Sequence, residues 1–516
     1  MYALNHEIKS RLTVFNRGFF GILVLLRALF LPDACVAQFD TAHQRPALTE
    51  ALIPTFLGNA QRNYYGQGAP DSLKLIWRLK LGSGVTNIST RLGDRIWSGC
   101  GWTGQPLLVR EDSSLFLLQG AFDHTLKKIR ADSGRVIWSY AFDDVIKGTA
   151  SLWHNPKPTS VNDALVILQG SRRGYGKNLG SKIVPSFRAI SYRSGEERWR
   201  HNVRRTPSIS RDVDGSPLIE RDTVYAAMEN GLFLRFRPDE TAWDSSGHFT
   251  APRILGAHRL YTRKDVISHR GNIVTESSPA RLGGRIYITS GSGHVYGYNV
   301  AADSIDWDFF IGSDMDGSPV VTADSCLLVA VEKQFIKGSG GVYKLNPALP
   351  PDSAVVWYAP SGDHVFATWL GGVIGSTGVN QLTRPKGYPL LAAFMGIDGR
   401  LVVVHQTDID SAAARTSGAV GDGKPRYYRP KVVFSQKIGA SISTPIFVGN
   451  KLIAAGYGGL YLFQYDAAGA FTLVDTFKGR SFEATPIVWE GRIYVGSRDG
   501  YLYCLGHPPL KKKETQ

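Results

Sequence analysis

The chain has little cysteine, and what it has is scattered. Its 516 residues include four cysteines, at positions 35, 100, 326 and 504. No Cys-x-x-Cys motif occurs, so neither a zinc knuckle nor covalently attached haem is indicated. We expect Cys326 and Cys504, which lie in strand-like patterns, to be small core residues. Disulfides are therefore not what holds this fold together.

Long helical patterns are also absent, whereas glycine and aromatic residues are abundant. The sequence has 56 Gly, 24 Phe and 22 Tyr, which fits many short strands joined by tight turns. The segment Gly491–Leu505 shows the pattern most clearly: two alternating apolar runs flank a turn that contains Asp499-Gly500. This is the signature of a β-hairpin. Weaker copies occur at residues 223–236, 285–300, 390–404 and 451–465, so one supersecondary unit is repeated.

Each unit has a typical beginning and a typical end. A small residue followed by proline precedes several hairpins, and because proline fits only the first residue or an unpaired edge of a strand, each pair predicts a strand start. These pairs are Ser216-Pro217, Ser278-Pro279, Ser318-Pro319, Thr444-Pro445 and Thr485-Pro486. A tryptophan ends other units, where its flat ring suits a wedge between neighbouring sheets. These are Trp138 and Trp199, after Asp132-Ser-Gly and Arg193-Ser-Gly turns, and Trp307 and Trp357 in shorter relatives.

Three strands around the hairpin and one that ends near the tryptophan make a four-stranded antiparallel unit, and radial stacking of such units forms a β-propeller. We count eight blades, the first spanning about residues 85–142. Residues 74–81 match a closing strand without a hairpin, and residues 481–505 have a hairpin without a closing strand. We therefore expect an N-terminal strand, about residues 73–81, to complete the C-terminal blade and close the ring. The predicted all-β propeller domain is residues 73–506, with a surface leader at 38–72 and a basic tail at 507–516.

The first 37 residues resemble a signal peptide. Lys9, Arg11 and Arg17 form a basic start, residues 19–31 are mostly apolar, and Cys35-Val-Ala37 supplies small residues before a cleavage site at Gln38. This predicts export to the periplasm, the outer membrane or the outside of the cell, with no transmembrane domain after cleavage. Retention of the segment as an anchor is an alternative, and lipid attachment at Cys35 is a third. The preceding Pro-Asp-Ala departs from the usual lipoprotein pattern.

The chain is basic, with a formal net charge of +15. A basic surface can favour anionic partners. The only dense run is Lys511–Lys513, so an evenly charged, solvated surface is preferred and a nucleic-acid interface is not. An insertion at residues 171–182 carries Arg172, Arg173 and Lys177, which either form a basic flap for an anionic partner or lie in a solvated loop.

Together these features resemble the quinoprotein-type (PQQ-like) propeller repeat. The resemblance rests on the Ser/Thr-Pro strand start, the Gly-Arg-Ile-Tyr-Val-Gly-Ser-Arg-Asp-Gly-Tyr-Leu-Tyr hairpin and the Asp-Ser-Gly-Arg-Val-Ile-Trp138 ending. Eight-bladed quinoprotein dehydrogenases and the propeller lipoprotein of the outer-membrane assembly machinery contain this repeat. Many of the dehydrogenases place two adjacent cysteines against the quinone, and this chain has no such pair. The resemblance covers about residues 73–506 and implies the fold more strongly than an activity.

In such a propeller, the loops that enter each first strand lie around the mouth of the central channel. Those loops supply five candidate ligand contacts: Trp102, Gln105, Glu276, Trp369 and Glu483. Trp102, which is surrounded by glycines, either stacks on a flat ligand or plugs the channel, and the plug is preferred.

The most distinctive local motif is Asp-x-Asp-Gly-Ser-Pro, which occurs twice. It places Asp212 and Asp214 in one loop and Asp314 and Asp316 in another. Four carboxylates from two units could bind a hard cation or a cationic group. Asp before Gly is also ordinary turn chemistry, which is the preferred interpretation.

No pattern of catalytic residues emerges. His364 follows Asp363 but has no paired serine or cysteine nucleophile. We therefore expect a monomeric, exported, noncatalytic propeller without a cofactor that presents its channel-mouth loops to a protein or an extracellular ligand. The alternative is a dehydrogenase of sugars or alcohols that depends on pyrroloquinoline quinone (PQQ) and calcium.

Overall fold

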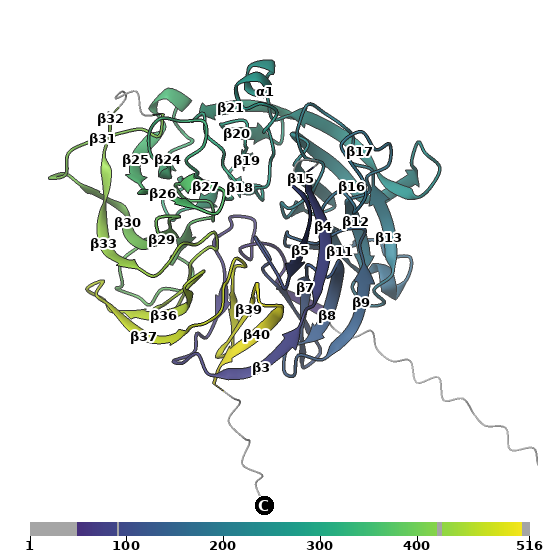
Figure 1. The fold of residues 1–516 in the computed structure, drawn as a ribbon, viewed down its shortest axis with the longest axis horizontal. Coiled ribbons are helices and arrows are strands. Elements are labelled where there is room, and N and C mark those ends of the chain that lie inside the picture. The colour runs from purple at the N-terminus through teal and green to yellow at the C-terminus, as the bar shows by residue number, and fades with distance from the viewer. Residues whose placement is uncertain (1–48, 90–91, 421–425, 508–516) are drawn as a thin grey trace, which may run out of the picture. The chain divides into compact units, whose positions relative to one another are not determined.

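The computed structural model describes residues 49–89, 92–420 and 426–507, which belong to one compact unit, Pro46–Gln516. Eight antiparallel sheets of four or five strands surround a centre and form an eight-bladed propeller (Figure 1). The predicted all-β, eight-bladed fold is confirmed. The predicted signal peptide, the start of the leader and most of the basic tail lie outside the described residues.

Blades 1–4 follow one another along the chain. Blade 1 contains β1 (Thr49–Ile53), β6 (Leu107–Glu111), β7 (Ser114–Gly120), β8 (Thr125–Arg130) and β9 (Val136–Ala141). Blade 2 contains β10 (Ser151–His154), β11 (Leu165–Gly170), β12 (Phe187–Ser191) and β13 (Glu197–His201). Blade 3 contains β14 (Leu218–Glu220), β15 (Thr223–Met228), β16 (Leu232–Trp243) and β17 (Thr250–Arg259). Blade 4 contains β18 (Ala280–Leu282), β19 (Arg285–Thr289), β20 (His294–Asn299) and β21 (Ser304–Phe310).

Blades 5–8 complete the ring. Blade 5 contains β22 (Val320–Val321), β23 (Leu327–Val331), β24 (Gly341–Leu345) and β25 (Val355–Pro360). Blade 6 contains β28 (Gly378–Val379), β29 (Leu391–Met395), β30 (Arg400–Asp410) and β33 (Arg429–Lys437). Blade 7 contains β34 (Ile446–Val448), β35 (Lys451–Gly456), β36 (Gly459–Tyr465) and β37 (Phe471–Phe477). Blade 8 contains β2 (Gly66–Gln67), β38 (Ile487–Trp489), β39 (Arg492–Gly496), β40 (Tyr501–Gly506) and β3 (Leu75–Lys80).

Three small hairpins and three short helical segments lie in loops between the blades or between strands of one blade. They are β4 (Ser83–Ser89) with β5 (Gly93–Ser98), β26 (Asp363–Phe366) with β27 (Trp369–Gly371), β31 (Thr416–Ser417) with β32 (Arg426–Tyr427), the α-helix α1 (Arg263–Ser268), and the 3₁₀ turns η1 (Val161–Asp163) and η2 (Pro351–Ser353). No helix in the described part of the chain is both long enough and apolar enough to cross a membrane.

Blade 8 combines strands from both ends of the described chain. The N-terminal strand β3 runs antiparallel to β40, with Trp77 opposite Cys504, and β2 runs parallel to β38. This pairing agrees with the sequence prediction for residues 73–81. The two ends of the propeller are therefore held in one hydrogen-bonded sheet.

The tryptophans at the blade ends link neighbouring blades, as the sequence predicts. The indole N–H of Trp77, in blade 8, donates to the carbonyl of Ala131, in blade 1, over 3.1 Å. The indoles of Trp138, Trp199, Trp307 and Trp357 make the same kind of bond to the next blade. Gly134 accommodates the Trp77 ring, because a Cβ there would lie 2.8 Å from it and the backbone φ of 72° disfavours other residues.

The predicted Ser/Thr-Pro strand starts are confirmed, and their hydroxyl residues form a belt around the channel. Each proline immediately precedes the first strand of its blade, β14, β18, β22, β34 or β38. From Ser216 to Thr485, each backbone N–H donates to the hydroxyl of the next blade over 2.8–3.3 Å. Thr103 and Thr149 join the two ends. This hydroxyl belt comprises Thr103, Thr149, Ser216, Ser278, Ser318, Ser376, Thr444 and Thr485.

The prediction of a surface leader is wrong for the described part of that segment. The strands β1 and β2 join blades 1 and 8, and residues 54–65 between them are largely buried against the inner strands of the ring. Phe56, Leu57 and Arg62 are fully buried. The Arg62 guanidinium donates to the carbonyls of Ser216 and Pro279, and burial lowers its pKa to about 9. Eight blades leave a central space that their own side chains do not fill, so a separate segment packs it.

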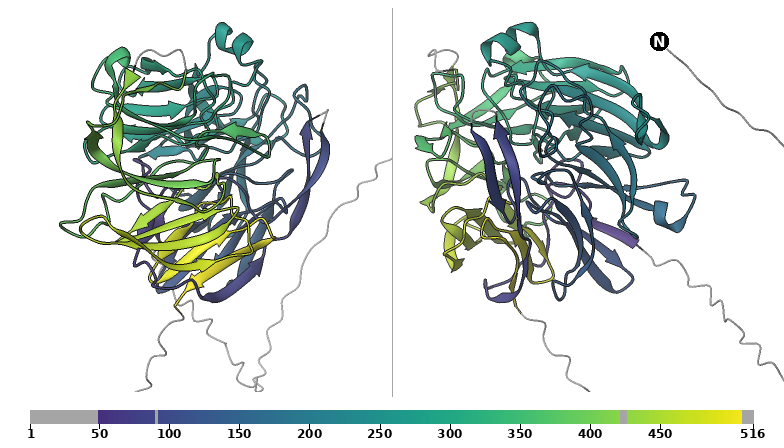
Figure 2. Two further views of the ribbon diagram at one scale, coloured as in Figure 1. Left: turned by 60° about the vertical axis from the view of Figure 1, so that its left-hand side comes forward. Right: turned by 45° about the vertical axis from the view of Figure 1, so that its right-hand side comes forward.

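The consecutive strands of the first blade begin later than expected. Residues 85–98, which the sequence analysis placed in the first blade, belong to the separate β4–β5 hairpin, and blade 1 instead takes β6–β9 together with the earlier strand β1. Figure 2 shows this dark purple hairpin against one face of the ring, outside the blades. It lies beside blade 2, because Thr86 accepts a hydrogen bond from Arg172.

Candidate binding site at the channel mouth

The loops that enter the first strands and the turns between second and third strands lie at one end of the blades, here called the mouth face. A cavity of about 360 Å³ opens there. Its lining includes six carboxylates and three basic side chains. The carboxylates are Asp212, Glu229, Glu276, Asp314, Asp316 and Glu332, and the bases are Lys147, Arg172 and Arg173.

One register position explains why the mouth is charged on one side. The residue two positions before the hydroxyl belt is Lys147 in blade 2, Asp214 in blade 3, Glu276 in blade 4 and Asp316 in blade 5. In blades 6 and 7 the same position holds Ile374 and Ile442, which pack around Trp102 in an apolar cluster. This position is therefore ionisable in blades 2–5 and apolar in blades 6 and 7, and in blade 8 it is Glu483, which is paired with Arg498.

Blade 3 holds a carboxylate set, Asp212, Asp214 and Glu229, and the chain itself pairs the two aspartates with basic side chains. The Lys147 ammonium makes an ion pair with Asp214 and lies 3.6 Å from Glu276. The Arg172 guanidinium donates to Asp212 Oδ2 over 2.7 Å. Burial alone would raise the pKa of Asp212, but Arg172 and Lys147 hold it below its ordinary value. Asp214 is more deeply desolvated, and burial raises its pKa to about 7 despite Lys147.

Blade 5 holds the equivalent set, Asp314, Asp316 and Glu332, without a basic partner. Within the described ranges, no lysine or arginine makes an ion pair with any of these three carboxylates. Asn272 donates to Asp314 Oδ2 over 2.7 Å. Burial raises the pKa of Asp314 to about 6 and that of Glu332 to about 8, and it raises the pKa of Asp316 well above its ordinary value.

Two aromatic residues line the cavity beside these charged sets. Trp97, from β5, faces the Arg172 guanidinium at 5.5 Å from the ring centre. Trp369, from β27, lines the cavity on the side of blade 6 and stacks with Phe366, with ring centres 6.5 Å apart. The mouth thus combines carboxylates with aromatic side chains, and Arg172 lies over the Trp97 ring as a cation does in a cation–π contact.

The structure brings together some of the predicted ligand contacts and separates others. Glu276 and Trp369 line the cavity. Trp102 is buried in the apolar cluster, as the preferred plug interpretation expects. Gln105 is buried on the leader side, where its Oε1 accepts from the Leu57 N–H over 3.1 Å. Glu483 makes a 2.9 Å ion pair with Arg498 and does not line the cavity.

The two Asp-x-Asp loops do converge. Asp212, Asp314 and Asp316 line the cavity, and Asp214 lies beneath it against Lys147. Oxygens of Asp214, Glu229 and Glu276 lie within 4.8 Å of one another, a spacing that suits a metal ion. The Lys147 ammonium already contacts two of these three residues.

The predicted basic flap is largely paired within the protein. Arg172 is buried against Asp212, and the backbone N–H of Arg173 donates to the other Asp212 oxygen over 3.0 Å. Lys177 lies 3.2 Å from Asp143. The positive charges of Arg172 and Lys177 are therefore paired with carboxylates of the protein, and this segment forms part of the wall of the mouth.

Sequence reasoning missed Lys147, Glu229, Glu332 and Trp97. Glu229 and Glu332 each follow directly after the second strand of their blade, β15 and β23. Small residues, Gly, Ser or Ala, occupy that place in most other blades. An acidic residue at this position in the two blades that carry the Asp-x-Asp loop was the signal that could have identified the sets.

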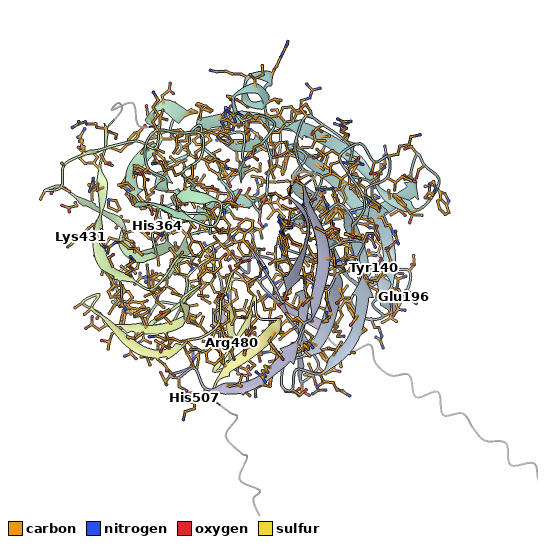
Figure 3. The ribbon with its side chains drawn as sticks, in the orientation of Figure 1. Tyr140, Glu196, His364, Lys431, Arg480 and His507 are labelled. Carbon is orange, nitrogen blue, oxygen red and sulfur yellow. The ribbon has the colours of Figure 1, made fainter. Side chains whose placement is uncertain are left out.

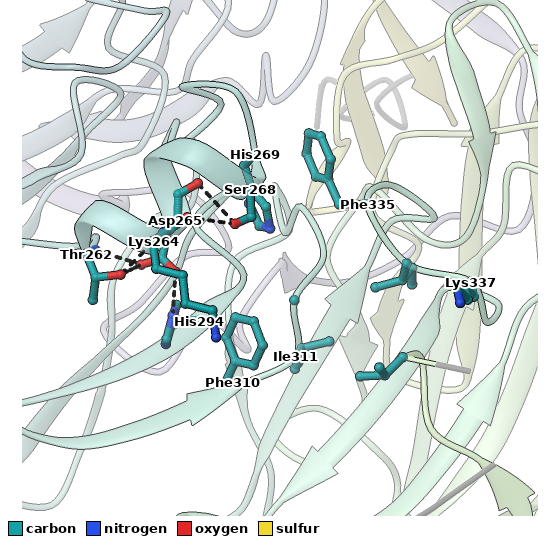
Figure 4. Close-up of a pocket in the computed structure, with 13 residues that line it drawn as sticks. Thr262, Lys264, Asp265, Ser268, His269, His294, Phe310, Ile311, Phe335 and Lys337 are labelled. Atoms are coloured by element: carbon teal, nitrogen blue, oxygen red, sulfur yellow. Dashed lines mark hydrogen bonds and ion pairs between the residues drawn. The ribbon is translucent and has the colours of Figure 1, made fainter. Parts of the chain in front are cut away.

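A second cavity, of about 660 Å³, lies at the outer edge of the same face beside α1 (Figure 4). Phe310 and Phe335 supply apolar walls, and His294 bridges Asp308, at 2.6 Å, and Asp265, at 3.5 Å. Ser268 donates to backbone carbonyls of its own helix and is not paired with His294. This geometry gives no activated nucleophile.

His364 is an exposed residue of β26 (Figure 3), and its neighbour Asp363 makes an ion pair with Lys333. The three cysteines in the described residues are buried and unbridged. Burial raises the pKa of the Cys100 and Cys504 thiols to about 12 and that of Cys326 to about 11. None of these thiols is activated as a nucleophile.

Residues 70–282 match the family model PQQ_2, described as outer membrane protein assembly factor BamB. The similarity to this family model therefore lies in the N-terminal half of the propeller. Solved structures are similar to most of its length. A europium-containing methanol dehydrogenase matches with a TM-score of 0.53 and 11% identity, over 90% of this chain and 99% of that chain. The quinohemoprotein alcohol dehydrogenase of Comamonas testosteroni matches with a TM-score of 0.51 and 13% identity, over 88% of this chain and 80% of that chain. BamB from Moraxella catarrhalis matches with a TM-score of 0.49 and 11% identity, over 84% of this chain and 100% of that chain. No curated protein matches the sequence.

The mouth fits a quinone cofactor poorly. PQQ is a polycarboxylate, so it needs cationic partners, whereas carboxylates outnumber bases around this cavity. Lys147 and Arg172 are already paired with carboxylates of the chain. Lys147 also takes the position at which Asp214 and Glu276 would hold a calcium ion. The PQQ-like repeat here therefore does not bring the cofactor environment with it.

Proposed function

We propose that this chain is an exported, noncatalytic PQQ-like propeller that binds a ligand or partner protein through its mouth face. The observation that carries the proposal is the open cavity at the mouth, lined by ionisable and aromatic side chains from several blades. Binding sites are typically concave, with a few polar groups converging on them.

The chemistry of the mouth supports binding more than catalysis. Lys147 and Arg172 are committed to ion pairs, and the Arg173 guanidinium donates to backbone carbonyls. The serines near the acids donate to fixed acceptors, as Ser210 does to Glu229 over 2.6 Å. General base catalysis needs a base within hydrogen-bond reach of the proton it removes. The resemblance to an outer-membrane assembly factor supports a partner protein, and the N-terminal sequence supports export.

Site-specific photo-crosslinking in cells tests the mouth as the binding face. A benzoylphenylalanine at Ile209, which is exposed at the mouth, should capture a partner. The same group at Leu349, which is exposed in the loop between the third and fourth strands of blade 5 at the opposite end, is the matched control. Crosslinks at Leu349 but not at Ile209 would refute the proposal.

N-terminal sequencing of the exported protein tests the predicted cleavage. The mature chain should begin at Gln38.

The alternative, a dehydrogenase of sugars or alcohols that uses PQQ and calcium, is supported by the shared repeat. It is tested by titrating the purified protein with PQQ and calcium and following dye reduction with a panel of sugars and alcohols. We expect neither saturable quinone binding nor turnover. Saturable binding with turnover would establish the dehydrogenase instead.

A further inference from the structure

Blades 3 and 5 carry the same carboxylate set, but only one set has cations supplied by the chain. In blade 3, Asp212 pairs with Arg172 and Asp214 pairs with Lys147. In blade 5, the equivalent residues Asp314 and Asp316 have no basic partner among the residues described.

The reason lies in the preceding blade. Lys147 stands two residues before the hydroxyl belt in blade 2, and the corresponding residue of blade 4 is Glu276, a carboxylate. Arg172 is the second residue after β11, and the corresponding residue after β19 is Gly291, which has no side chain. Blade 4 therefore offers blade 5 neither the ammonium nor the guanidinium that blade 2 offers blade 3.

We propose that the blade 5 set, Asp314, Asp316 and Glu332, binds an ammonium or guanidinium group of an organic ligand, and so receives from outside what Lys147 and Arg172 give the blade 3 set. This inference rests on the proposed function of the mouth face and names the chemistry of its ligand.

One unsatisfied oxygen marks the place for the cation. Asp314 Oδ1 has no hydrogen-bond donor among the described residues, although the Asp314 side chain is more than nine-tenths buried and lines the cavity. A buried carboxylate without a donor is costly, and a charged donor removes that cost. Gly291 lies beside this oxygen but has no side chain that could donate to it. Even a Cβ at that position would lie only 2.8 Å from Asp314 Oδ1.

The surroundings favour an organic cation over a bare metal ion. Asn272 is held between Asp314, at 2.7 Å, and Gln334, at 2.8 Å, so amide groups fix the carboxylate orientation. Trp369, whose ring stacks with Phe366, lines the same cavity. A quaternary or primary ammonium gains from an aromatic ring as well as from the carboxylates.

Ligand binding should be linked to proton release. Without a cation, Asp316 shares a hydrogen bond with Asp314, and burial raises the pKa of Asp316 well above its ordinary value. The other charged groups that face this set are Glu276, from blade 4, and Lys147, from blade 2. A bound ammonium replaces the shared proton, so affinity should rise as pH increases.

The test is calorimetric titration of the purified protein with agmatine, which carries an ammonium and a guanidinium group. We expect saturable binding at pH 8, weaker binding at pH 5.5, and heats that differ between buffers of different ionisation enthalpy because protons are released. 1-Pentanol, a neutral amphiphile, should not bind. The double variant D316N/E332Q should weaken agmatine binding about tenfold or more, the loss of one charged hydrogen bond. D352N, an exposed acid in η2 of the same blade, should bind like the parent.

A second variant supplies the missing cation from within. Glu276→Lys places an ammonium at the blade 4 position that matches Lys147, so it should abolish agmatine binding at pH 8. Circular dichroism and the thermal midpoint show whether each variant is folded. The inference is overturned if agmatine does not bind at pH 8, if D316N/E332Q binds it unchanged, or if calcium binds in its place. Crosslinking at Ile209 that persists in those cases would leave the mouth proposal standing without this ligand.

Discussion

Blades 3 and 5 present the same six-residue loop, Asp-x-Asp-Gly-Ser-Pro, and the same glutamate after the second strand, yet their electrostatic states differ. In blade 3, Arg172 keeps the pKa of Asp212 below its ordinary value. In blade 5, burial raises the pKa of the equivalent Asp314 to about 6. The loops are alike, so the difference arises in the neighbouring blade. In a repeat protein each unit packs against its neighbours. Here the preceding blade determines whether the aspartates of the duplicated loop are paired with basic side chains of the chain or left without them.

The largest expected effect comes from removing the cation of blade 3. Lys147→Met leaves Asp214 and Glu276 without a counter-ion in a buried place, which should destabilise the protein by about 3–5 kcal/mol at pH 8. The loss should be smaller at pH 5, where the carboxyls bind protons. Denaturant unfolding at both pH values measures it. Lys333→Met, which breaks the more exposed pair with Asp363, should cost less than about 1 kcal/mol. Equal losses in the two variants would mean that the blade 3 pair is not a buried one.

The next effect concerns the pH dependence that blade 5 imposes. In the unfolded chain Glu332 titrates near its ordinary value, whereas burial raises its folded pKa to about 8. Its folded form therefore binds the proton more tightly, and the stability this contributes is complete below about pH 4 and is lost as pH rises toward 8. Asp314, with a folded pKa of about 6, acts in the same direction over a lower range.

Replacing these acids by amides should remove that loss. We expect the thermal midpoint of the parent to fall between pH 5 and pH 8, and the midpoint of D316N/E332Q to fall less. At pH 8 the variant should be the more stable by roughly 2 kcal/mol. Melting curves across this pH range, with D352N as the control, decide the matter. A variant that is less stable than its parent at pH 8 would contradict the assignment of blade 5 as an uncompensated set.

Most of the fold was predictable because its signals are local and repeated. A proline before each first strand, a Gly-bearing turn and a closing tryptophan recur along the chain, so even the pairing of β3 with β40 follows from two incomplete units. The central segment was not predictable in this way. Arg62 hydrogen-bonds a carbonyl 217 residues away, and no repeat pattern announces that a fully buried arginine will fill the channel.

The site was predictable in part for the same reason. The duplicated Asp-x-Asp loops supplied three of its six lining acids, Asp212, Asp314 and Asp316, and the loop topology placed Glu276 and Trp369 at the mouth. Lys147 escaped notice because a single lysine before a glycine has no special pattern, and its meaning appears only when Asp214 and Glu276 from two other blades surround it. Gln105 and Glu483 share the loop position of the true lining residues but turn to partners within the protein.

The smallest expected effect tests whether the loop itself contributes to the contrast. The variable residue between the two aspartates is Val213 in blade 3 and Met315 in blade 5, and both are buried. Met315→Val makes the blade 5 loop identical to the blade 3 loop and removes little buried volume, so it should cost about 1 kcal/mol at any pH. The slope of thermal midpoint against pH should stay that of the parent, because blade 4 still supplies no cation. A variant whose pH slope becomes as shallow as that of D316N/E332Q would show that the loop composition, and not the neighbouring blade, sets the difference between the two regions.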